Sequence, residues 1–280
     1  METVDSPAAP SVVFIAHGSP MFALRPRMAG VALASLANTL TRPRAVLVIS
    51  PHWETELATV GTAHQLETIH DFGGFDPALY AIQYPAQGFP QGAQEVVAAL
   101  DRAGLPVHTD SQRGLDHGAW VPLRTLFPQA DVPIVPLSIQ HHGGPDHAYR
   151  VGQALAPLVE QGWLIVATGN ITHNLGDWQQ AEMGLAIDTS YAQRFSDWVH
   201  GQLISGDITA LLDYRLHNPD ALRAHPRDEH LLPSFTALGA AGAGAQARAI
   251  HRGIADHVIA MDSYGFQPVS SPSSTVQVLP

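Results

Sequence analysis

Residues 11–20, SVVFIAHGSP, place a short apolar run directly before a histidine and the turn-forming residues Gly-Ser-Pro. A run this short and this rich in β-branched residues is typical of a buried strand. The pattern recurs at 45–52, AVLVISPH, and at 163–174, WLIVATGNITHN. The sequence therefore predicts three strands, each followed closely by a histidine, and the ends of these strands are where we expect the functional site.

Predicted helices alternate with these strands. Apolar periodicity and helix-end signals predict helices over 21–40, 92–103, 120–127, 146–159 (with Asp146 as N-cap), 191–203, 208–216 and 229–241, and further strands over 57–62, 132–139 and 258–263. The stretch 71–90, rich in Gly, Pro and aromatic residues, is expected to be a long loop. The alternation predicts an α/β fold, a single domain with a central, mainly helix-covered sheet. Ligands of such sheets bind beyond the carboxyl ends of the strands, where we expect the site.

The composition excludes several classes of protein. The chain has 280 residues, of which 45% are apolar and 14% charged, as in a folded globular protein. Its net charge of −11 and its lack of a Lys/Arg cluster argue against a nucleic-acid partner. No signal peptide is visible and no apolar stretch approaches the roughly 20 residues that span a bilayer, so we expect a cytoplasmic protein without a membrane partner. The sequence is compatible with a homo-oligomer but does not fix the oligomeric state.

Histidines are the candidate functional residues. The chain has no cysteine, so any bound metal must take nitrogen and oxygen ligands, and neutral imidazole is the commonest of these. His17 and His52 follow predicted strands, and His230 in EHLLP (229–233) lies at the start of a predicted helix; together they predict one metal site. His173 has a similar placement but an ambiguous role. His117 in LDHGAW (115–120) is either a structural residue near a helix cap or a hydrogen-bond donor to the site.

The ordered set of motifs resembles the class III extradiol ring-cleaving dioxygenases, in the DOPA 4,5-dioxygenase branch of the superfamily of the protocatechuate 4,5-dioxygenase catalytic subunit. The resemblance is carried by AHGSP (16–20), SPHWE (50–54), HDFGGFDPALYAIQYPAQG (70–88), GLDHGAWVPL (114–123), GNITHNL (169–175), HPRDEHLLPSFTALGAAG (225–242) and MDSYGF (261–266). These motifs span most of the chain in family order, which makes the set far more specific than HGSP alone.

The resemblance implies a catalytic domain over 1–267, and the Ser/Pro-rich composition of 268–280 predicts a loose tail after it. It implies a mononuclear non-haem Fe(II) site with His17, His52 and His230 as ligands, and Zn(II) can occupy such a site in purified or crystallised protein. His173 becomes the acid/base residue, near enough to serve as a fourth metal ligand, and His117 a second catalytic histidine. The expected partners are O₂ and a catechol, DOPA-like or related.

The substrate tail is the least defined part of the expectation. A carboxylate on the catechol would need a cationic partner, for which Arg227 or Arg124 is available. Trp53, Tyr264 and the aromatic residues of 71–90 could line the cleft. For each of these side chains, a surface or packing role is the alternative that the sequence leaves open.

Three other functions remain open. A metal chelatase also begins with a strand followed by His-Gly-Ser, but SPHW and EHLLP are not expected in it. A non-enzymatic binding protein on the same fold would not need all five motif histidines. A zinc hydrolase would need a carboxylate base beside the metal, for which Glu229, Asp228, Glu54 and Asp116 are candidates.

Overall fold

A mixed sheet of eight strands forms the centre of the molecule. The computed structural model describes residues 9–267, so the tail predicted over 268–280 lies outside the described residues. In spatial order the strands are β4 (Val107–Asp110), β3 (Ala58–Gly61), β5 (Ile134–Ile139), β2 (Ala45–Glu54), β6 (Trp163–Gly169), β1 (Val12–Ala16), β10 (Ser263–Gln267) and β7 (Gln246–His251). A small two-stranded sheet pairs β8 (Ile254–Ala255) with β9 (Ile259–Ala260).

The four central strands, β5, β2, β6 and β1, run parallel to one another. They consist largely of Val, Ile, Leu and Ala, and all residues of β1, β5 and β6 are buried. Strands covered on both faces are expected to read as continuous apolar runs, which is why these strands were recognisable in the sequence. Strand β10 is antiparallel to both β1 and β7, and β3 is antiparallel to β5.

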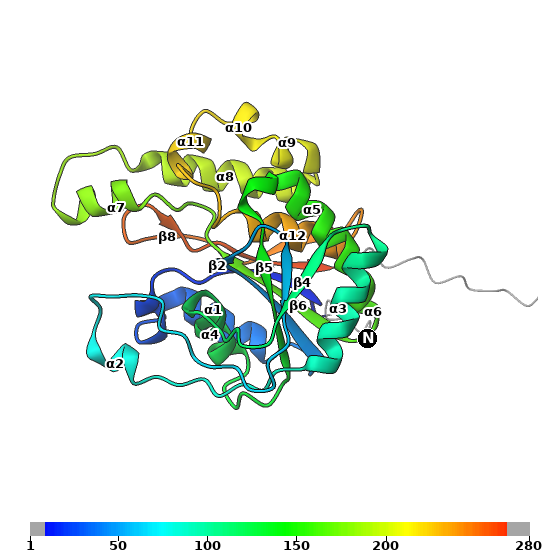
Figure 1. Ribbon diagram of the computed structural model, residues 1–280. Coiled ribbons are helices and arrows are strands. Elements are labelled where there is room, and N and C mark those ends of the chain that lie inside the picture. Colours follow the sequence, from blue (N-terminus) through cyan, green and yellow to red (C-terminus); the bar gives the residue numbers. More distant parts are fainter. Residues whose placement is uncertain (1–8, 268–280) are drawn as a thin grey trace, which may run out of the picture.

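Helices cover both faces of the sheet, as predicted (Figure 1). One face carries α1 (Arg27–Ala37) and α4 (His117–Leu126), and the other carries α5 (Gly144–Leu155) and α12 (Leu232–Ala241). The remaining helices are η1 (Pro20–Ala23), α2 (Pro77–Tyr80), α3 (Pro90–Arg102), η2 (His141–Gly143), α6 (Pro157–Glu160), α7 (Leu175–Glu182), α8 (Ser190–Ser205), α9 (Ile208–Leu212), α10 (Tyr214–His217) and α11 (Ala221–Ala224). No helix in the part of the chain that the structure describes is long and apolar enough to cross a membrane.

Several predicted helices differ in their bounds. The helix predicted over 21–40 is divided into η1 and α1, because Pro26 disfavours helical backbone in the residue before it. Helix α5 begins at Gly144, so Asp146 lies in its first turn and is not the N-cap. Helix α4 begins at His117, three residues before the predicted start, because the Asp116 side chain accepts a hydrogen bond from Ala119 N and caps it.

Strand β2 is longer than the predicted 45–49 and includes His52. The sequence predicts that this strand ends at Ile49, where the apolar run ends. The register against β5 instead shifts between Ile49 and Glu54, which marks a bulge or a similar irregularity. Irregularities of this kind change the direction of a side chain at the edge of a sheet, and here they fall at the histidine of the motif.

Helices α5 and α12 cross so closely that glycine is needed at the contact. A Cβ atom on Gly239 of α12 would lie 2.0 Å from the Tyr149 carbonyl oxygen, and one on Gly152 of α5 would lie 2.1 Å from the Thr236 carbonyl oxygen. Both obstacles are backbone atoms, which cannot rotate away. The crossing holds α12 and the segment that precedes it against the sheet.

We predict that Gly239→Ala lowers the free energy of unfolding by about 1–3 kcal/mol or more, the usual cost of overpacking a core. The matched control is Gly201→Ala in α8, where a Cβ atom meets nothing within 4 Å. That change should stabilise the protein by about 0.5–1 kcal/mol, because alanine has the higher helix propensity. Urea denaturation of both variants measures the difference, and equal stabilities would contradict the prediction.

Candidate metal centre

The carboxyl ends of β1, β6 and β2 bring three histidines to one edge of the sheet. Strand β6 pairs in parallel with β1 on one side, Ala16 lying opposite Gly169, and with β2 on the other. His17 directly follows β1, and His173 follows β6 after a short turn. His52 lies near the carboxyl end of β2. These three strand-end histidines of the sequence therefore lie at a common edge.

A fourth histidine, His230, reaches this edge from the segment before α12. Its carbonyl oxygen accepts a hydrogen bond from Asn170 N at 3.0 Å, which holds the segment across the end of β6. A Cβ atom on Gly169 would lie only 2.1 Å from that carbonyl oxygen. The glycine of the GNITHN motif is thus required for the close approach of the two backbones.

The rings of His17, His52 and His230 form a nearly equilateral triangle. Their centroids are 5.1 Å (His17–His52), 5.3 Å (His17–His230) and 5.0 Å (His52–His230) apart. One nitrogen of each ring lies within 4.8 Å of the chosen nitrogens of the other two. The Nε2 atoms of His17 and His52 are 3.1 Å apart.

These distances fit a shared metal ion. Two nitrogens bonded to one ion at about 2.1 Å, with an angle of 90–109° between the bonds, are separated by roughly 3.0–3.4 Å. The 3.1 Å between the two Nε2 atoms falls in that range. Three imidazoles with converging nitrogens, those of His17 and His230 buried and that of His52 half-buried, are a donor set suited to a first-row transition metal. The group could therefore bind a metal ion.

The three rings are held in the neutral form that binds metals. Burial, and after it the neighbouring imidazoles, lowers the pKa of His17 and of His230 well below the ordinary value. Burial and the nearby His117 lower the pKa of His52 to about 4, against the opposing attraction of two carboxylates. At pH 7 these rings are uncharged, and each has a nitrogen lone pair available.

A carboxylate, Asp71, holds His117 beside this triangle. Asp71 Oδ1 accepts a hydrogen bond from His117 N at 2.8 Å, and its Oδ2 lies 3.0 Å from His117 Nδ1 and 3.5 Å from His52 Nδ1. Burial would raise the pKa of Asp71, but the hydrogen bonds with His117 outweigh it and lower that pKa to about 2. The ionised carboxylate can only accept, so His117 Nδ1 donates to it.

A second carboxylate, Glu229, lies behind His230 and His173. Its Oε1 is 2.9 Å from His230 Nδ1 and 3.6 Å from His173 Nδ1. Burial would raise the pKa of Glu229, but the interactions with His173 and with Arg227 outweigh it and lower that pKa. Arg227 Nε lies 3.6 Å from Glu229 Oε2, and the Arg227 guanidinium also pairs with Glu54.

His173 stacks on His230, which bears on its two candidate roles. The ring centroids are 3.4 Å apart and the planes differ by 15°. An imidazole binds a metal through a lone pair that lies in the plane of the ring. Because the two ring planes are nearly parallel and stacked, one metal ion cannot lie in the plane of both rings. The geometry therefore favours the acid/base role over that of a fourth ligand.

The site opens into a large cleft, with a cavity volume of about 1210 Å³. Of the five histidines of the candidate site, all except His17 line it, as do the aromatic residues Phe72 and Phe75 and the cation Arg227. Helix α7 and the β8–β9 hairpin contribute the outer wall and lie together at one end of the molecule (Figure 1). The structure thus brings Arg227 to the cleft, as the sequence analysis expected.

Trp53 and Tyr264 do not line the cleft, which corrects the expectation that they bind substrate. Trp53 is buried, and its ring lies under the Arg113 guanidinium, 5.0 Å from ring centroid to Cζ. Tyr264 is fully buried, and its hydroxyl lies 3.2 Å from Asp262 Oδ2. Both side chains lie on strands, where alternate residues face opposite sides of the sheet.

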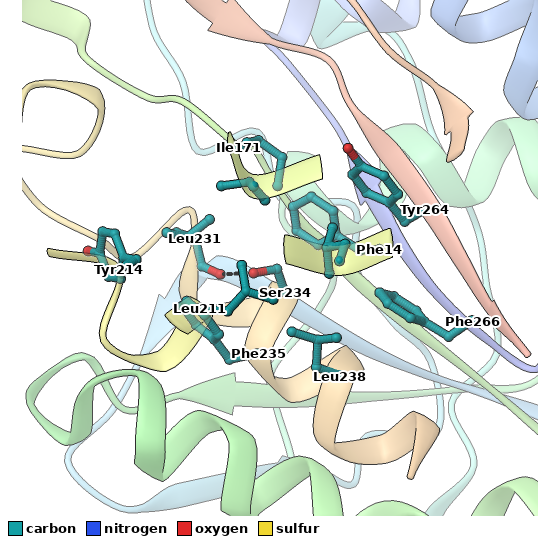
Figure 2. A pocket seen from close by; sticks show the side chains of 12 residues that line it. Phe14, Ile171, Leu211, Tyr214, Leu231, Ser234, Phe235, Leu238, Tyr264 and Phe266 are labelled. Carbon is teal, nitrogen blue, oxygen red and sulfur yellow. Dashed lines mark hydrogen bonds between the residues drawn. The ribbon is translucent and has the colours of Figure 1, made fainter. Parts of the chain in front are cut away.

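Figure 2 shows where Tyr264 lies instead, among apolar side chains between the sheet and α12. Phe14, Phe235 and Phe266 surround the same space, whose volume of about 10 Å³ holds at most one water molecule. The space is a packing defect of the core and does not admit a substrate.

Asp71 is the residue of this site that the sequence analysis did not single out. It belongs to the HDFGGFD motif, but the motif lies in a loop without periodicity, so the sequence gives no direction for its side chain. Glu229 was considered only as a candidate base for a hydrolase. The signal that could have found both is their position directly beside a histidine, His70 and His230 respectively.

Known proteins resemble this chain over nearly all of the residues that the structure describes. Residues 12–266 match the family model described as the catalytic LigB subunit of aromatic ring-opening dioxygenase. The chain is 38% identical over 257 residues to the protein named 4,5-DOPA dioxygenase extradiol from Beta vulgaris, with 90% of this chain and 95% of the relative covered. It is 38% identical over 234 residues to the protein of the same name from Escherichia coli K12, with 81% and 84% covered.

A solved structure resembles most of the chain. It belongs to an uncharacterized protein from Escherichia coli K12 and superposes with a TM-score of 0.75 at 31% sequence identity. The match covers 90% of this chain and 97% of the other. The structural similarity and the sequence similarity therefore each cover about 90% of this chain.

We predict that the metal-free protein loses stability as the pH falls from about 6.5 to 5. His52 and His225 have a folded-state pKa of about 4, whereas an unfolded histidine titrates near 6.5. In this window the unfolded chain takes up protons that the folded chain refuses, so the free energy of unfolding falls by up to about 1.4 kcal/mol per pH unit for each such histidine. Urea denaturation at several pH values measures this slope. Constant stability between pH 5 and 6.5 would contradict the burial of neutral imidazoles.

Proposed function

The chain belongs to the family of the catalytic LigB subunit of aromatic ring-opening dioxygenases, in its extradiol DOPA branch, and we propose that it cleaves a catechol with O₂ at a mononuclear non-haem Fe(II) site. The observation that carries the proposal is the convergence of His17, His52 and His230 from three separate segments, with one nitrogen of each within 4.8 Å of the others. A dioxygenase of this family needs such a metal-binding set, and the described cleft gives a substrate access to it.

His17, His52 and His230 would hold the Fe(II) ion. When bound, Fe(II) supplies a Lewis acid for the two catechol oxygens and an electron donor for O₂. Three neutral protein ligands leave room for additional ligands on one ion. The chain itself contributes the geometry: two strand ends and the segment before α12 fix the three rings, and the close approach at Gly169 fixes that segment.

His173 and His117 would move the protons. A catechol loses protons when it binds a metal, and the later ring-opening steps return one. Both histidines line the cleft, and both have Nδ1 directed at a carboxylate, so Nε2 is the nitrogen left for the substrate. We assign the main acid/base role to His173 and a hydrogen bond to oxygen or to the substrate hydroxyl to His117.

The rest of the cleft would receive the body of the catechol. Phe72 and Phe75 offer apolar surface, and Arg227 offers a cation at the rim for a carboxylate. Arg227 already pairs with Glu54, so a substrate carboxylate would have to compete with that pair. A panel of DOPA, protocatechuate, caffeate and unsubstituted catechol, each followed by oxygen uptake and product spectra, separates the substrate classes.

The zinc hydrolase hypothesis requires a carboxylate base beside the metal, and the candidate carboxylates already contact other groups. Glu229 lies 2.9 Å from His230 Nδ1, and Glu54 pairs with Arg227. Asp116 accepts hydrogen bonds from Ser50 and Arg113, and Asp228 accepts one from the Tyr214 hydroxyl. Each carboxylate is thus already engaged by a neighbouring group of the protein. The family match and the two named relatives above, both called dioxygenases, favour the dioxygenase over a chelatase or a binding protein.

We predict that Fe(II)-loaded protein consumes O₂ with a catechol and that Zn(II)-loaded protein does not. Zinc has no accessible redox change, so it cannot pass electrons to O₂. It should nevertheless occupy the same three histidines, because its affinity for nitrogen ligands exceeds that of Fe(II). To test this, the protein is stripped of metal with a chelator and reloaded with either Fe(II) or Zn(II) alone, and O₂ consumption is measured with an oxygen electrode. Equal rates with carefully iron-free zinc protein would refute the dioxygenase proposal.

We predict that His173→Ala retains iron but lowers kcat by about 10²–10⁴-fold, the usual contribution of a positioned proton-transfer group. If His173 is instead a ligand, the variant should lose metal, and added Fe(II) should partly restore turnover. His117→Ala is the comparison, since it should keep its full iron content. Metal analysis together with kinetics distinguishes the two roles. Wild-type turnover at normal iron content would show that His173 has only a structural role.

A further inference from the structure

Two carboxylates lie behind the imidazoles of the site, and each is shared by two rings. Asp71 Oδ2 faces Nδ1 of His52, a proposed ligand, and Nδ1 of His117, a proposed proton carrier. Glu229 Oε1 faces Nδ1 of His230 and of His173, which have the same two roles. Four of the five rings thus have a carboxylate behind them.

The two carboxylates differ in which ring they hold more closely. Asp71 lies 3.0 Å from the ring of His117 and also accepts from the His117 backbone N–H at 2.8 Å, whereas His52 Nδ1 is 3.5 Å away. Glu229 lies 2.9 Å from His230 Nδ1, whereas His173 Nδ1 is 3.6 Å away. Asp71 therefore binds the proton carrier most closely, and Glu229 binds the ligand most closely.

A carboxylate behind an imidazole fixes which nitrogen carries the proton. When Nδ1–H donates to the carboxylate, Nε2 keeps its lone pair and points to the other side of the ring. For His230 that nitrogen is free to bind a metal, and for His117 it is free to accept a proton. His17 differs, because its buried Nδ1 has no hydrogen-bond partner within the described residues.

The carboxylates also balance charge. Three neutral imidazoles leave a divalent ion with its full charge of +2, and a buried charge is costly unless it is compensated nearby. Asp71 and Glu229 contribute −2 at the rim of the same cluster. Arg227, which lies near Glu229, is itself balanced by Glu54. Asp71 and Glu229 would therefore offset the charge of a divalent cation bound by the three imidazoles.

We propose that Asp71 and Glu229 are positioning residues with divided roles: Glu229 orients His230 for the metal, and Asp71 orients His117 for the substrate. The inference rests on the proposed metal site and catechol chemistry. The two roles predict two different losses. Loss of Glu229 should weaken metal binding, because Glu229 acts mainly through a metal ligand, and loss of Asp71 should lower kcat, because Asp71 acts mainly through a residue that does not bind the metal.

The experiment compares the size-matched variants Glu229→Gln and Asp71→Asn. Zn(II) affinity is measured by competition with a chromophoric chelator, and kcat and KM are measured with a catechol at saturating Fe(II). Glu229→Gln should weaken Zn(II) binding by about 10–100-fold, the usual cost of losing such a partner, and saturating Fe(II) should restore most of kcat. Asp71→Asn should keep Zn(II) affinity within about threefold and lower kcat by about 10–100-fold at any Fe(II) concentration.

Glu95→Gln is the control, since Glu95 of α3 also pairs with a basic side chain, that of Arg44, but on the surface and outside the residues that line the cleft. It should leave Zn(II) affinity and kcat unchanged. Circular dichroism melting establishes that each variant folds. If an amide variant does not fold, Glu229→Asp and Asp71→Glu keep the charge, displace the oxygen and should show the same division at a smaller size.

Three results would overturn the inference. Wild-type Zn(II) affinity in the Glu229 variant would show that Glu229 does not orient the metal ligand. Unchanged kcat in the Asp71 variant would show that Asp71 does not orient His117. Equal loss of metal in both variants would show that the two carboxylates do not have divided roles. The proposed function fails separately. A wild-type protein that binds Zn(II) but consumes no O₂ with any catechol overturns that function, and the affinity comparison remains decisive for Glu229.

Discussion

The mutual burial of His17, His52 and His230 is the constraint on which the rest of the site depends. Three imidazoles whose centroids are 5.0–5.3 Å apart can be packed together in a buried setting only while they are neutral. Burial lowers the pKa of each ring and keeps it in that form. The parallel pairing of β1, β6 and β2 supplies the rigid edge that brings the rings together, and the segment before α12 closes the triangle.

The site uses both nitrogens of its imidazoles. The nitrogens of the triangle converge, and the opposite nitrogens of four rings face two carboxylates that neighbouring segments supply. An imidazole whose Nδ1–H is fixed in this way cannot change tautomer without losing a hydrogen bond, although it can still take up a proton at Nε2. This explains how a cluster of five histidines can assign binding to some rings and proton transfer to others, although all have the same chemistry.

The sequence predicted most of the sheet centre and the histidines, because buried parallel strands read as continuous apolar runs and each is followed by a motif. It did not predict β7 or β4. Strand β7 follows the Gly/Ala tract and alternates between exposed and partly buried residues, and β4 has only four residues and no buried one. Such edge strands owe their conformation to their neighbours, which a local pattern does not show.

Side-chain direction was also outside the reach of the sequence. Tyr264 and Trp53 lie in the expected motifs, yet one points into the core and the other lies under Arg113. Asp71 lies in a loop without periodicity, and only the folded chain shows that it contacts His117, 46 residues away. The strand-end histidines lie at one edge of the sheet, as their placement in the sequence predicted, whereas the sequence did not predict the direction of a side chain within a motif.

The most direct test of the metal centre is a crystal structure of the Fe(II)-loaded protein, grown without oxygen, with anomalous scattering measured at the iron edge. We expect one ion bonded to His17, His52 and His230 at roughly 2.0–2.2 Å, with Asp71, Glu229 and His173 outside bonding distance. An ion bonded to either carboxylate, or to His173 in place of one of the three, would contradict the arrangement described above.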